Sequence, residues 1–443
     1  MKMRKLMAAG LCVMMAAGLT ACGGGSKDGG SSDAGASKGE AGSGSLTINI
    51  WDANQQAGIQ EICDDWTAES GTKVKVEVID WDNYWTLLES AASGGTLADV
   101  FWMHSDYAQI YMENDILLDL TDYVKDVDLD QYYEDILAIY TRDDGKIYGL
   151  PKDHDTIALL YNKTLFDEAG VEYPTAEWTY EDMYEAAKAI TENTPDDTYG
   201  YAINTSNDQD SWYNFIYAYG GNVVNTTKDD TAIDSPEGKA GMEMVRKLLT
   251  VSTPQAVVAE TKTDALFLSG KAAMITQGSW MINTFYTAEN AADYAWAMLP
   301  YADLNGDGKC QKEERQSCYN GLGWSAAANT SNPEAAADLI KYLCSEPAQI
   351  KQAELGVTMA GIPAISEPFA AAFDGMDVSA FDQIEAEGTL YARPGTRNSG
   401  VWNNAMKQAG GFLDAWQNPE DPAVMEQACD NVAKMIRDAI AAE

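Results

Sequence analysis

The part of the chain that contains enough apolar residues to fold begins near residue 46, with a stretch in which apolar and polar positions alternate. Residues 46–51 alternate with a period of two, as a strand with one buried face does, and residues 74–78 repeat the pattern. Apolar residues recur at helical spacing over 59–66, and the apolar run 99–103 suits an inner strand. Strand, helix, strand, helix and strand in this order predict an α/β fold with a parallel sheet and covering helices.

Later segments carry start signals for helices. Thr179 and Asp182 have the spacing of a capping box, in which each side chain satisfies a free backbone N–H at the helix start. Pro333 and Pro422 each stand at a first helical position, where the missing N–H of proline has no partner to lose. Helices are therefore predicted to begin at these three places.

The stretch 265–280 is read as the end of a helix, a short apolar strand and a sharp turn. Gly270 suits the left-handed backbone at a helix C-terminus, and Gly278 allows the turn that places Trp280 beyond the strand. In open α/β sheets, ligands bind beyond the carboxyl ends of strands. Trp280 is therefore a candidate for stacking on a ligand, with core packing as the alternative.

The start of the chain has the layout of a secretory signal. Basic residues precede an uncharged run over 6–20, which is shorter than the roughly 20 residues that a membrane-spanning helix needs. The run ends in Leu-Thr-Ala-Cys at Cys22, which resembles a bacterial lipoprotein signal. This resemblance implies cleavage after residues 1–21 and acylation of Cys22. The Gly- and Ser-rich segment 22–45 would then be a flexible tether.

Composition narrows the possible partners. The chain has 29 Lys and Arg against 69 Asp and Glu, a formal net charge of −40, so nucleic acid and anionic lipid surfaces are poor partners. A neutral or cationic small ligand fits this charge more easily. After the signal and Cys22, an odd and scattered set of cysteines remains, which is no disulfide framework, although Cys310 and Cys318 could pair.

A series of ordered motifs resembles one known family. The motifs are Ile50-Trp51-Asp52, Asp99-Val-Phe-Trp-Met-His104, Leu160-Tyr-Asn-Lys163, Gly278-Ser-Trp280 and Gly321-Leu-Gly-Trp324. Together they resemble the extracellular solute-binding proteins of ABC importers, and specifically the sugar-binding branch that includes maltodextrin-binding proteins.

This resemblance implies a two-lobed, periplasmic-binding-protein-like fold of type II, with hinge strands between the lobes and ligand bound in the cleft. The first lobe would contain residues 46–155 and 279–326, and the second lobe residues 156–278 and 327–443. The crossings would lie near residues 155–156, 277–278 and 324–328. Such proteins close by hinge rotation around the ligand.

Sugars present hydroxyl groups that need directed polar partners and C–H faces that pack on aromatic rings. The chain has 12 Trp and 23 Tyr against 9 Phe, and this excess of amphipathic rings favours contact surfaces. By similarity, the ligand contacts would be Asp52, Trp102, Asp106, Asp155, Trp212, Trp280, Trp324, Arg393 and Trp402. Each Trp has core packing as its alternative. Relatives in the maltodextrin branch carry Asp-Arg after the Trp-x-His segment, and the Arg is missing beside Asp106, so a pentose, hexose or short oligosaccharide fits equally.

Residues 303–314 match the twelve-residue EF-hand loop, whose oxygen ligands wrap around one Ca²⁺ ion. No flanking helix pair is evident, and the alternative is a solvated acidic turn. The expected ligands are Asp303, Asn305, Asp307, the carbonyl of Lys309, Gln311 and Glu314.

These observations predict a monomeric, lipid-anchored protein at the outer face of the cell membrane. It would capture a carbohydrate and deliver it to the transmembrane permease subunits of an ABC importer, without catalysis. Two alternatives stay open. A lipid-anchored glycoside hydrolase would need two carboxylates at a defined separation. A binding protein for a cationic solute such as a polyamine would also suit the acidic chain.

Overall fold

The computed structural model describes residues 44–365 and 367–443. Cys22, the signal 1–21 and nearly all of the tether 22–45 lie outside these residues. Within them, no helix is both long and apolar enough to cross a membrane. The first strand begins at Ser45, next to the predicted start of the folded part.

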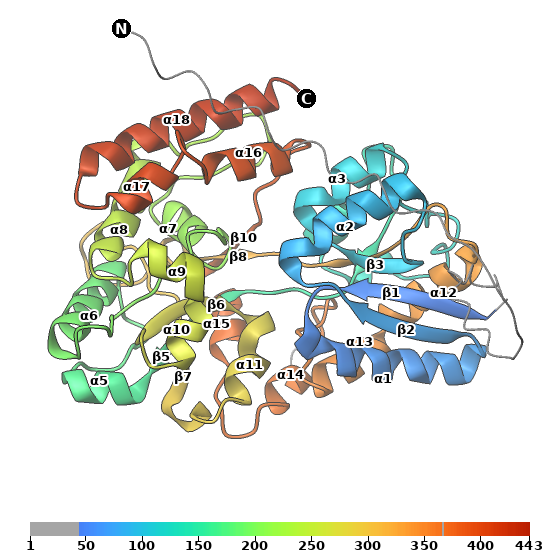
Figure 1. The fold of residues 1–443 in the computed structure, drawn as a ribbon, viewed down its shortest axis with the longest axis horizontal. Helices are drawn as coiled ribbons and strands as arrows, with labels where there is room; N and C mark the ends of the chain where they lie inside the picture. The colour runs from blue at the N-terminus through green and yellow to red at the C-terminus, as the bar shows by residue number, and fades with distance from the viewer. Residues whose placement is uncertain (1–43, 366) are drawn as a thin grey trace, which may run out of the picture. The chain divides into compact units, whose positions relative to one another are not determined.

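A five-stranded sheet organises the first lobe (Figure 1). The strand order is β2-β1-β3-β9-β4; β1, β2 and β3 are parallel, and β9 runs antiparallel to β3 and β4. The elements of this lobe are β1 (Ser45–Ile50), α1 (Ala53–Ser70), β2 (Lys73–Val78), α2 (Trp81–Gly94), β3 (Val100–Met103), α3 (Ser105–Glu113), α4 (Glu134–Ile139), β4 (Leu150–Pro151), β9 (Gly323–Ala326), α12 (Pro333–Leu343) and α13 (Glu346–Glu354).

The predicted strand–helix–strand series is confirmed in this lobe. Buried and half-exposed residues alternate along β1, as its period of two requires. The covering helix α1 buries Ile59, Ile62 and Trp66 on one face and ends at Gly71, whose φ of 76° suits glycine.

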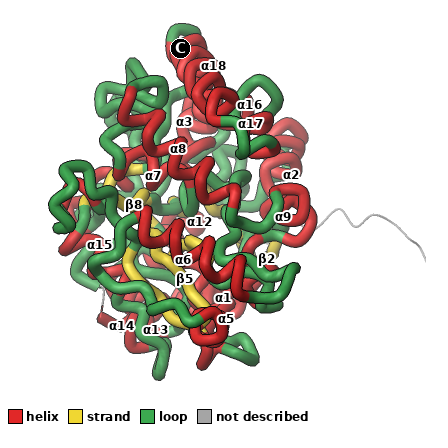
Figure 2. The backbone as a smooth tube through the Cα atoms, turned by 90° about the vertical axis from the view of Figure 1, so that its left-hand side faces the viewer, coloured by secondary structure: helices red, strands yellow, loops and turns green. Residues whose placement is uncertain are grey.

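The second lobe is built on a three-stranded sheet of order β6-β5-β7, in which β5 runs antiparallel to both neighbours. Figure 2, in which this lobe faces the viewer, shows its helices outside β5. The strands are β5 (Ile157–Asn162), β6 (Met274–Gly278) and β7 (Tyr294–Met298), and a separate parallel pair is formed by β8 (Gln316–Tyr319) and β10 (Thr389–Ala392).

Helices make up most of the second lobe. They are α5 (Lys163–Ala169), α6 (Tyr180–Asn193), α7 (Trp212–Ala218), α8 (Pro236–Thr250), α9 (Gln255–Thr261), α10 (Thr263–Leu268), α11 (Ile282–Tyr286), α15 (Ala380–Glu387), α16 (Ser399–Met406), α17 (Leu413–Gln417) and α18 (Pro422–Ile440), with α14 (Glu367–Ala371) leading from the first lobe. The helix starts predicted from sequence are present, including the capping box of Thr179 and Asp182.

Strand pairing places two segments differently from the expected lobe boundaries. Residues 294–298 form β7 and pair with β5, so they lie in the second lobe. Residues 333–354 form α12 and α13, which pack on β9 and α1 in the first lobe. The reason is that the chain does not pass into the first lobe after β6. After residues 277–278 it stays in the second lobe and forms β7, which pairs with β5 on the side opposite β6. The chain crosses instead at residues 152–156 and 320–322, and again after α13.

The cysteines of the described residues are all free thiols. Cys318 is buried in β8, and Cys310 lies half-exposed in the acidic loop that precedes it. The possible Cys310–Cys318 disulfide is therefore not formed.

Candidate functional site

Two indole rings lie together at the carboxyl ends of the parallel strands in the first lobe. Trp51 directly follows β1, and Trp81 opens α2 just after β2. Their ring centroids are 5.2 Å apart in an edge-to-face arrangement. Trp81 is 45% exposed and Trp51 is half-buried. We call these two rings the aromatic platform; neither was among the ligand contacts predicted from sequence.

Polar groups stand beside the platform. Asp52 caps α1: its Oδ1 accepts from the backbone N–H of Asn54 at 2.8 Å, and its Oδ2 accepts from Gln55 Nε2 at 3.1 Å. The ring of His104, which follows β3, lies 5.6 Å from that of Trp81. The platform therefore combines exposed ring surface with adjacent hydrogen-bonding groups, which is the combination that a sugar needs.

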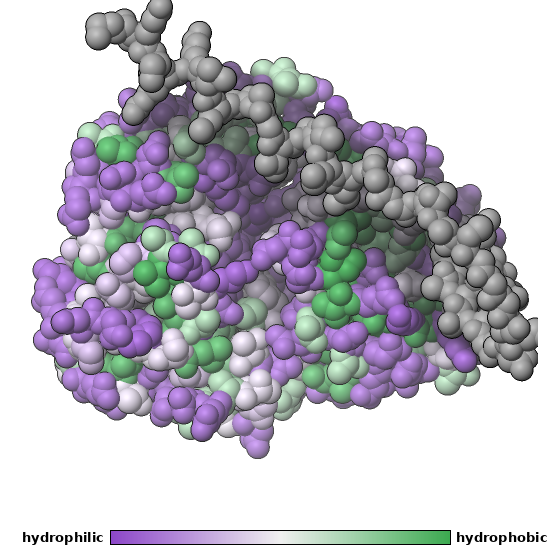
Figure 3. Space-filling view, viewed as in Figure 1, coloured by the Kyte–Doolittle hydropathy of each residue, from purple (hydrophilic) through white to green (hydrophobic). Residues whose placement is uncertain are grey.

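This edge of the first lobe faces the second lobe. Asn54 Nδ2 donates to Thr284 Oγ1 of α11 at 3.1 Å, and Lys262, between α9 and α10, lies 3.3 Å from Asp82 of α2. The space-filling view shows the surface hollowed between the two lobes and mostly hydrophilic there (Figure 3). The platform therefore lies at an interlobe cleft.

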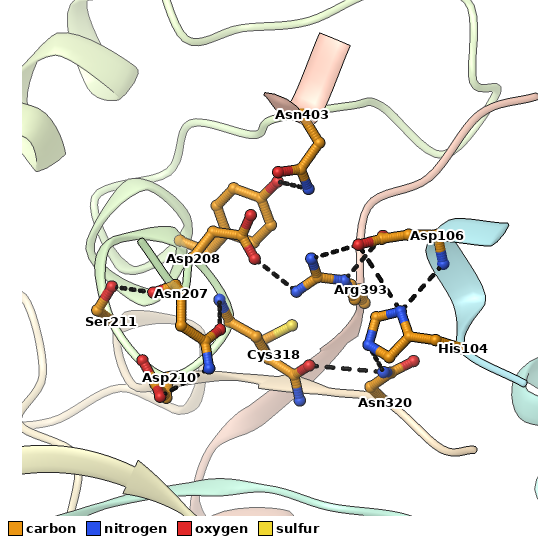
Figure 4. A network of polar contacts seen from close by, with 12 residues as sticks. His104, Asp106, Asn207, Asp208, Asp210, Ser211, Cys318, Asn320, Arg393 and Asn403 are labelled. Atoms are coloured by element: carbon orange, nitrogen blue, oxygen red, sulfur yellow. Dashed lines mark hydrogen bonds and ion pairs between the residues drawn. The ribbon is translucent and has the colours of Figure 1, made fainter. Parts of the chain in front are cut away.

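A chain of alternating charges connects the lobes inside this region (Figure 4). Arg393, just after β10, donates from Nε to Asp106 Oδ1 at 3.0 Å and from Nη2 to Asp106 Oδ2 at 2.9 Å. Its Nη1 lies 2.6 Å from Asp208 Oδ1, and Lys407 Nζ lies 2.7 Å from Asp208 Oδ2. Asp106 belongs to α3 of the first lobe, whereas the other three residues belong to the second. We call these four residues the charge network.

Ionisation of the charge network follows from its pairing. Burial, the largest single influence, would raise the pKa of Asp106 and of Asp208, but the opposing interactions together prevail, chiefly those with Arg393 at both residues and with Lys407 at Asp208, so both pKa values are lowered. Both carboxylates are therefore charged at neutral pH. Burial lowers the pKa of the neighbouring His104 to about 4, so this imidazole is neutral.

Asp155 lies in the crossing that leads into β5, where it is 7% exposed. Its Oδ1 accepts from Gln209 Nε2 and, at 3.1 Å, from the backbone N–H of Asn320 in the next crossing. Burial, with Asp153 nearby, raises its pKa well above the ordinary value for a carboxyl. Asp155 thus ties the two crossings together.

Four of the predicted tryptophans pack in the cores of the lobes. Trp102 is fully buried between Trp51 and Trp324, with ring centroids 4.9 and 5.9 Å away. The four buried rings, each at most 1% exposed, are Trp102, Trp212, Trp324 and Trp402. In this structure these rings offer no surface on which a sugar could stack, and each packs as its core alternative describes.

Trp280 is half-buried and packs against Gly278. Gly278 has an ordinary extended backbone, with φ of −88°, so it does not supply the special turn expected from sequence. A Cβ atom at this position would lie 1.9 Å from the Trp280 ring. Glycine is required here because the indole occupies the place of a side chain.

The acidic loop 303–314 is built from side chains that accept backbone N–H groups. Asp303 Oδ1 accepts from Gly306 at 2.9 Å, and Glu314 Oε2 accepts from Gln311 at 2.9 Å. Gly308, at the glycine position of an EF-hand loop, has φ of 69°. The donor chemistry therefore suits Ca²⁺, although no three His, Cys, Asp or Glu side chains of the described residues converge closely enough to hold a metal ion.

Comparison with known proteins places the chain among binding proteins. The family model described as "Bacterial extracellular solute-binding protein" matches residues 52–350. A binding protein of Brucella abortus is 26% identical over 268 residues, which cover 59% of this chain and 64% of that protein, so the chain spans less than two thirds of that relative's length. The galactooligosaccharide-binding protein of Bacillus subtilis is 26% identical over 349 residues, covering 76% of this chain and 75% of that protein.

A solved structure shows the same fold. An ABC substrate-binding protein from Listeria monocytogenes, in complex with cycloalternan, superposes with a TM-score of 0.78 at 22% sequence identity. The match covers 90% of this chain and 99% of that one. The two-lobed α/β fold inferred from the sequence motifs is therefore confirmed.

Proposed function

This chain belongs to the family of bacterial extracellular solute-binding proteins, and from that premise we propose that it captures a carbohydrate between its lobes and delivers it to an ABC importer. The proposed ligand is a sugar or short oligosaccharide. The proposed partners are the permease subunits of the importer, and the protein is proposed to act as a monomer without catalysis.

The observation that carries this proposal is the aromatic platform. The rings of Trp81, which is 45% exposed, and Trp51 lie together at the carboxyl ends of parallel strands, where α/β folds bind ligands. The C–H face of a sugar ring packs on an indole, while Asp52 and the neighbouring amides offer acceptors and donors for hydroxyl groups. The carbohydrate-binding names among the relatives agree with this assignment.

A panel of neutral mono- and oligosaccharides, screened by thermal shift, tests the proposal. A ligand that binds only the folded protein raises its melting temperature, and the shift grows with ligand concentration. We expect at least one neutral saccharide to raise the melting temperature. If no saccharide did so while an amino acid or polyamine did, the carbohydrate assignment would be lost.

Trp81→Ala is expected to weaken saccharide binding about tenfold to a hundredfold, since truncating an aromatic anchor costs on the order of 1–3 kcal/mol. Because nearly half of the Trp81 side chain is exposed, the free energy of unfolding should change much less than for a buried Trp. Isothermal titration with the best saccharide of the panel measures the affinity. Leu87→Ala, which removes another exposed apolar side chain of α2, is the matched control and should bind normally. Equal affinities in the two variants would exclude Trp81 from the site.

We propose that the chain is anchored by acylation of Cys22 and acts at the outer face of the cell membrane. The basis is the sequence of the first 22 residues. Cys22→Ser should move the protein from the membrane fraction to the soluble fraction, because the thiol that receives the lipid is absent. Cys310→Ser, which removes another thiol that is not fully buried, should remain with the membrane. Membrane retention of the Cys22 variant would contradict the anchor.

We also propose that the loop 303–314 binds Ca²⁺ as a structural ion. The support is the spacing of its oxygen donors and the left-handed backbone of Gly308. Ca²⁺ at up to about 10⁻³ M should raise the melting temperature, as expected for an extracellular calcium module. Glu314→Gln should abolish this shift and the luminescence of bound Tb³⁺. Glu313→Gln, the same change at the exposed neighbour, should retain both, and loss in both variants would argue against the assigned ligands.

A further inference from the structure

The charge network contains two cations, Arg393 and Lys407, and Arg393 reaches across to Asp106 of the first lobe. Their side chains are 5% and 18% exposed. Arg is the residue best suited to bidentate binding of carboxylate and phosphate groups, and Lys binds phosphate as a point charge. If these cations were free, the cleft would suit a phosphorylated or carboxylated ligand.

Both cations are instead held by carboxylates of the chain itself. All three nitrogens of the Arg393 guanidinium are engaged, Nε and Nη2 with Asp106 and Nη1 with Asp208. Lys407 Nζ contacts the other oxygen of Asp208 at 2.7 Å and also donates to the carbonyl of Ser206 at 3.1 Å. Two positive charges meet two negative charges, so the charge network is electrically neutral.

The titratable groups next to the charge network are uncharged, so they do not change its net charge of zero. His104 touches Asp106 from the first lobe and is neutral because burial lowers its pKa. Asp210 is buried beside Asp208, and burial raises its pKa well above the ordinary value. His104 connects the charge network to the platform, since its ring lies 5.6 Å from that of Trp81 and its Nδ1 lies 3.7 Å from Asp106 Oδ2.

We propose that Asp208 is a specificity-determining residue: by neutralising Arg393 and Lys407 together, it makes the cleft select uncharged ligands and reject phosphorylated or carboxylated ones. Asp208 is suited to this role because it is 1% exposed and contacts both cations at once. An anionic ligand would have to displace a buried carboxylate that already holds two partners. This inference rests on the proposed carbohydrate function and specifies the class of carbohydrate.

Isothermal titration with inorganic phosphate and with spermidine tests the proposal in the wild type, in Asp208→Asn and in Asp208→Asn/Lys407→Met. The wild type should bind neither probe. Asp208→Asn releases one positive charge and should bind phosphate at least tenfold more tightly than the wild type. The double variant removes the released charge again and should return phosphate binding to the wild-type level. It is the matched control, because it contains the same substitution at position 208.

Phosphate binding by the wild type that Arg393→Gln abolishes would overturn the proposal, as would spermidine binding by the wild type. A folded Asp208→Asn variant that gains no phosphate binding would overturn it too. If Asp208→Asn does not fold, Asp106→Asn is the substitute: its side chain is 14% exposed, it leaves one carboxylate, Asp208, against two cations, and phosphate binding must again appear. The saccharide panel is independent of these titrations, so failure of the carbohydrate function and failure of the Asp208 role are distinguishable.

Discussion

Trp102→Ala is expected to lower the free energy of unfolding by about 3–5 kcal/mol, the usual cost of truncating a fully buried aromatic side chain. Trp102 has no exposed surface, and its ring packs between Trp51 and Trp324. The ammonium group of the fully buried Lys152 also lies 4.4 Å from its ring centroid, so the variant would lose a cation–π contact in addition to leaving a cavity. Urea denaturation, with linear extrapolation to water, measures the loss.

Trp81→Ala is the comparison for this prediction, since it removes the same side chain from an exposed position 5.2 Å from the ring of Trp51. The two variants should differ in the property that they lose: Trp102→Ala lowers the free energy of unfolding, whereas Trp81→Ala lowers the affinity for saccharide. A Trp102→Ala protein of normal stability that no longer binds saccharide would show that Trp102 contacts the ligand after all.

Arg393→Gln is expected to cost about 3–5 kcal/mol of unfolding free energy, because removing one partner of a buried ion pair leaves the other charges uncompensated. Asp106 would lose its bidentate partner, and Asp208 would keep only Lys407. The contact that joins the lobes through Asp106 would be lost as well. Chemical denaturation at neutral pH measures the cost, and a double-mutant cycle with Asp106→Asn isolates the interlobe pair.

The cost of Arg393→Gln should depend on pH with a defined sign. Pairing holds the pKa values of Asp106 and Asp208 below the ordinary value of 3.8, although burial opposes this. The stability that this pairing contributes is therefore present above pH 3.8 and is lost as the pH falls through the lowered pKa values. The wild type and the variant should converge in strong acid. A constant difference across this range would show that the two carboxylates are not paired with Arg393.

Local pattern was enough to predict the strands and helices that carry a clear signal in the sequence. The period of two along β1, the capping box at the start of α6 and the proline at the start of α18 depend only on neighbouring residues, and each is present. The family resemblance drawn from the ordered motifs is confirmed by the family match. The lobe boundaries could not be obtained in the same way, because they depend on which strands pair across long distances in the sequence.

Candidate site residues were harder to predict, because a Trp at the end of a strand has the same sequence signal whether its ring faces the core or the cleft. Trp102 ends in the core and Trp81 beside the cleft. Trp81 could have been found from its place after a strand, in parallel with Asp52 after β1. Asp106 pairs with Arg393, 287 residues further along the chain, and no local motif reveals this contact.

The most direct test of the proposed carbohydrate site is a crystal structure of the protein with the saccharide that gives the largest thermal shift. We expect a sugar ring packed on the exposed face of Trp81, between the lobes, with its hydroxyl groups bonded to residues beside the platform and no charged group on the ligand facing Arg393. A saccharide bound elsewhere, with Trp51 and Trp81 free of contact, would contradict it.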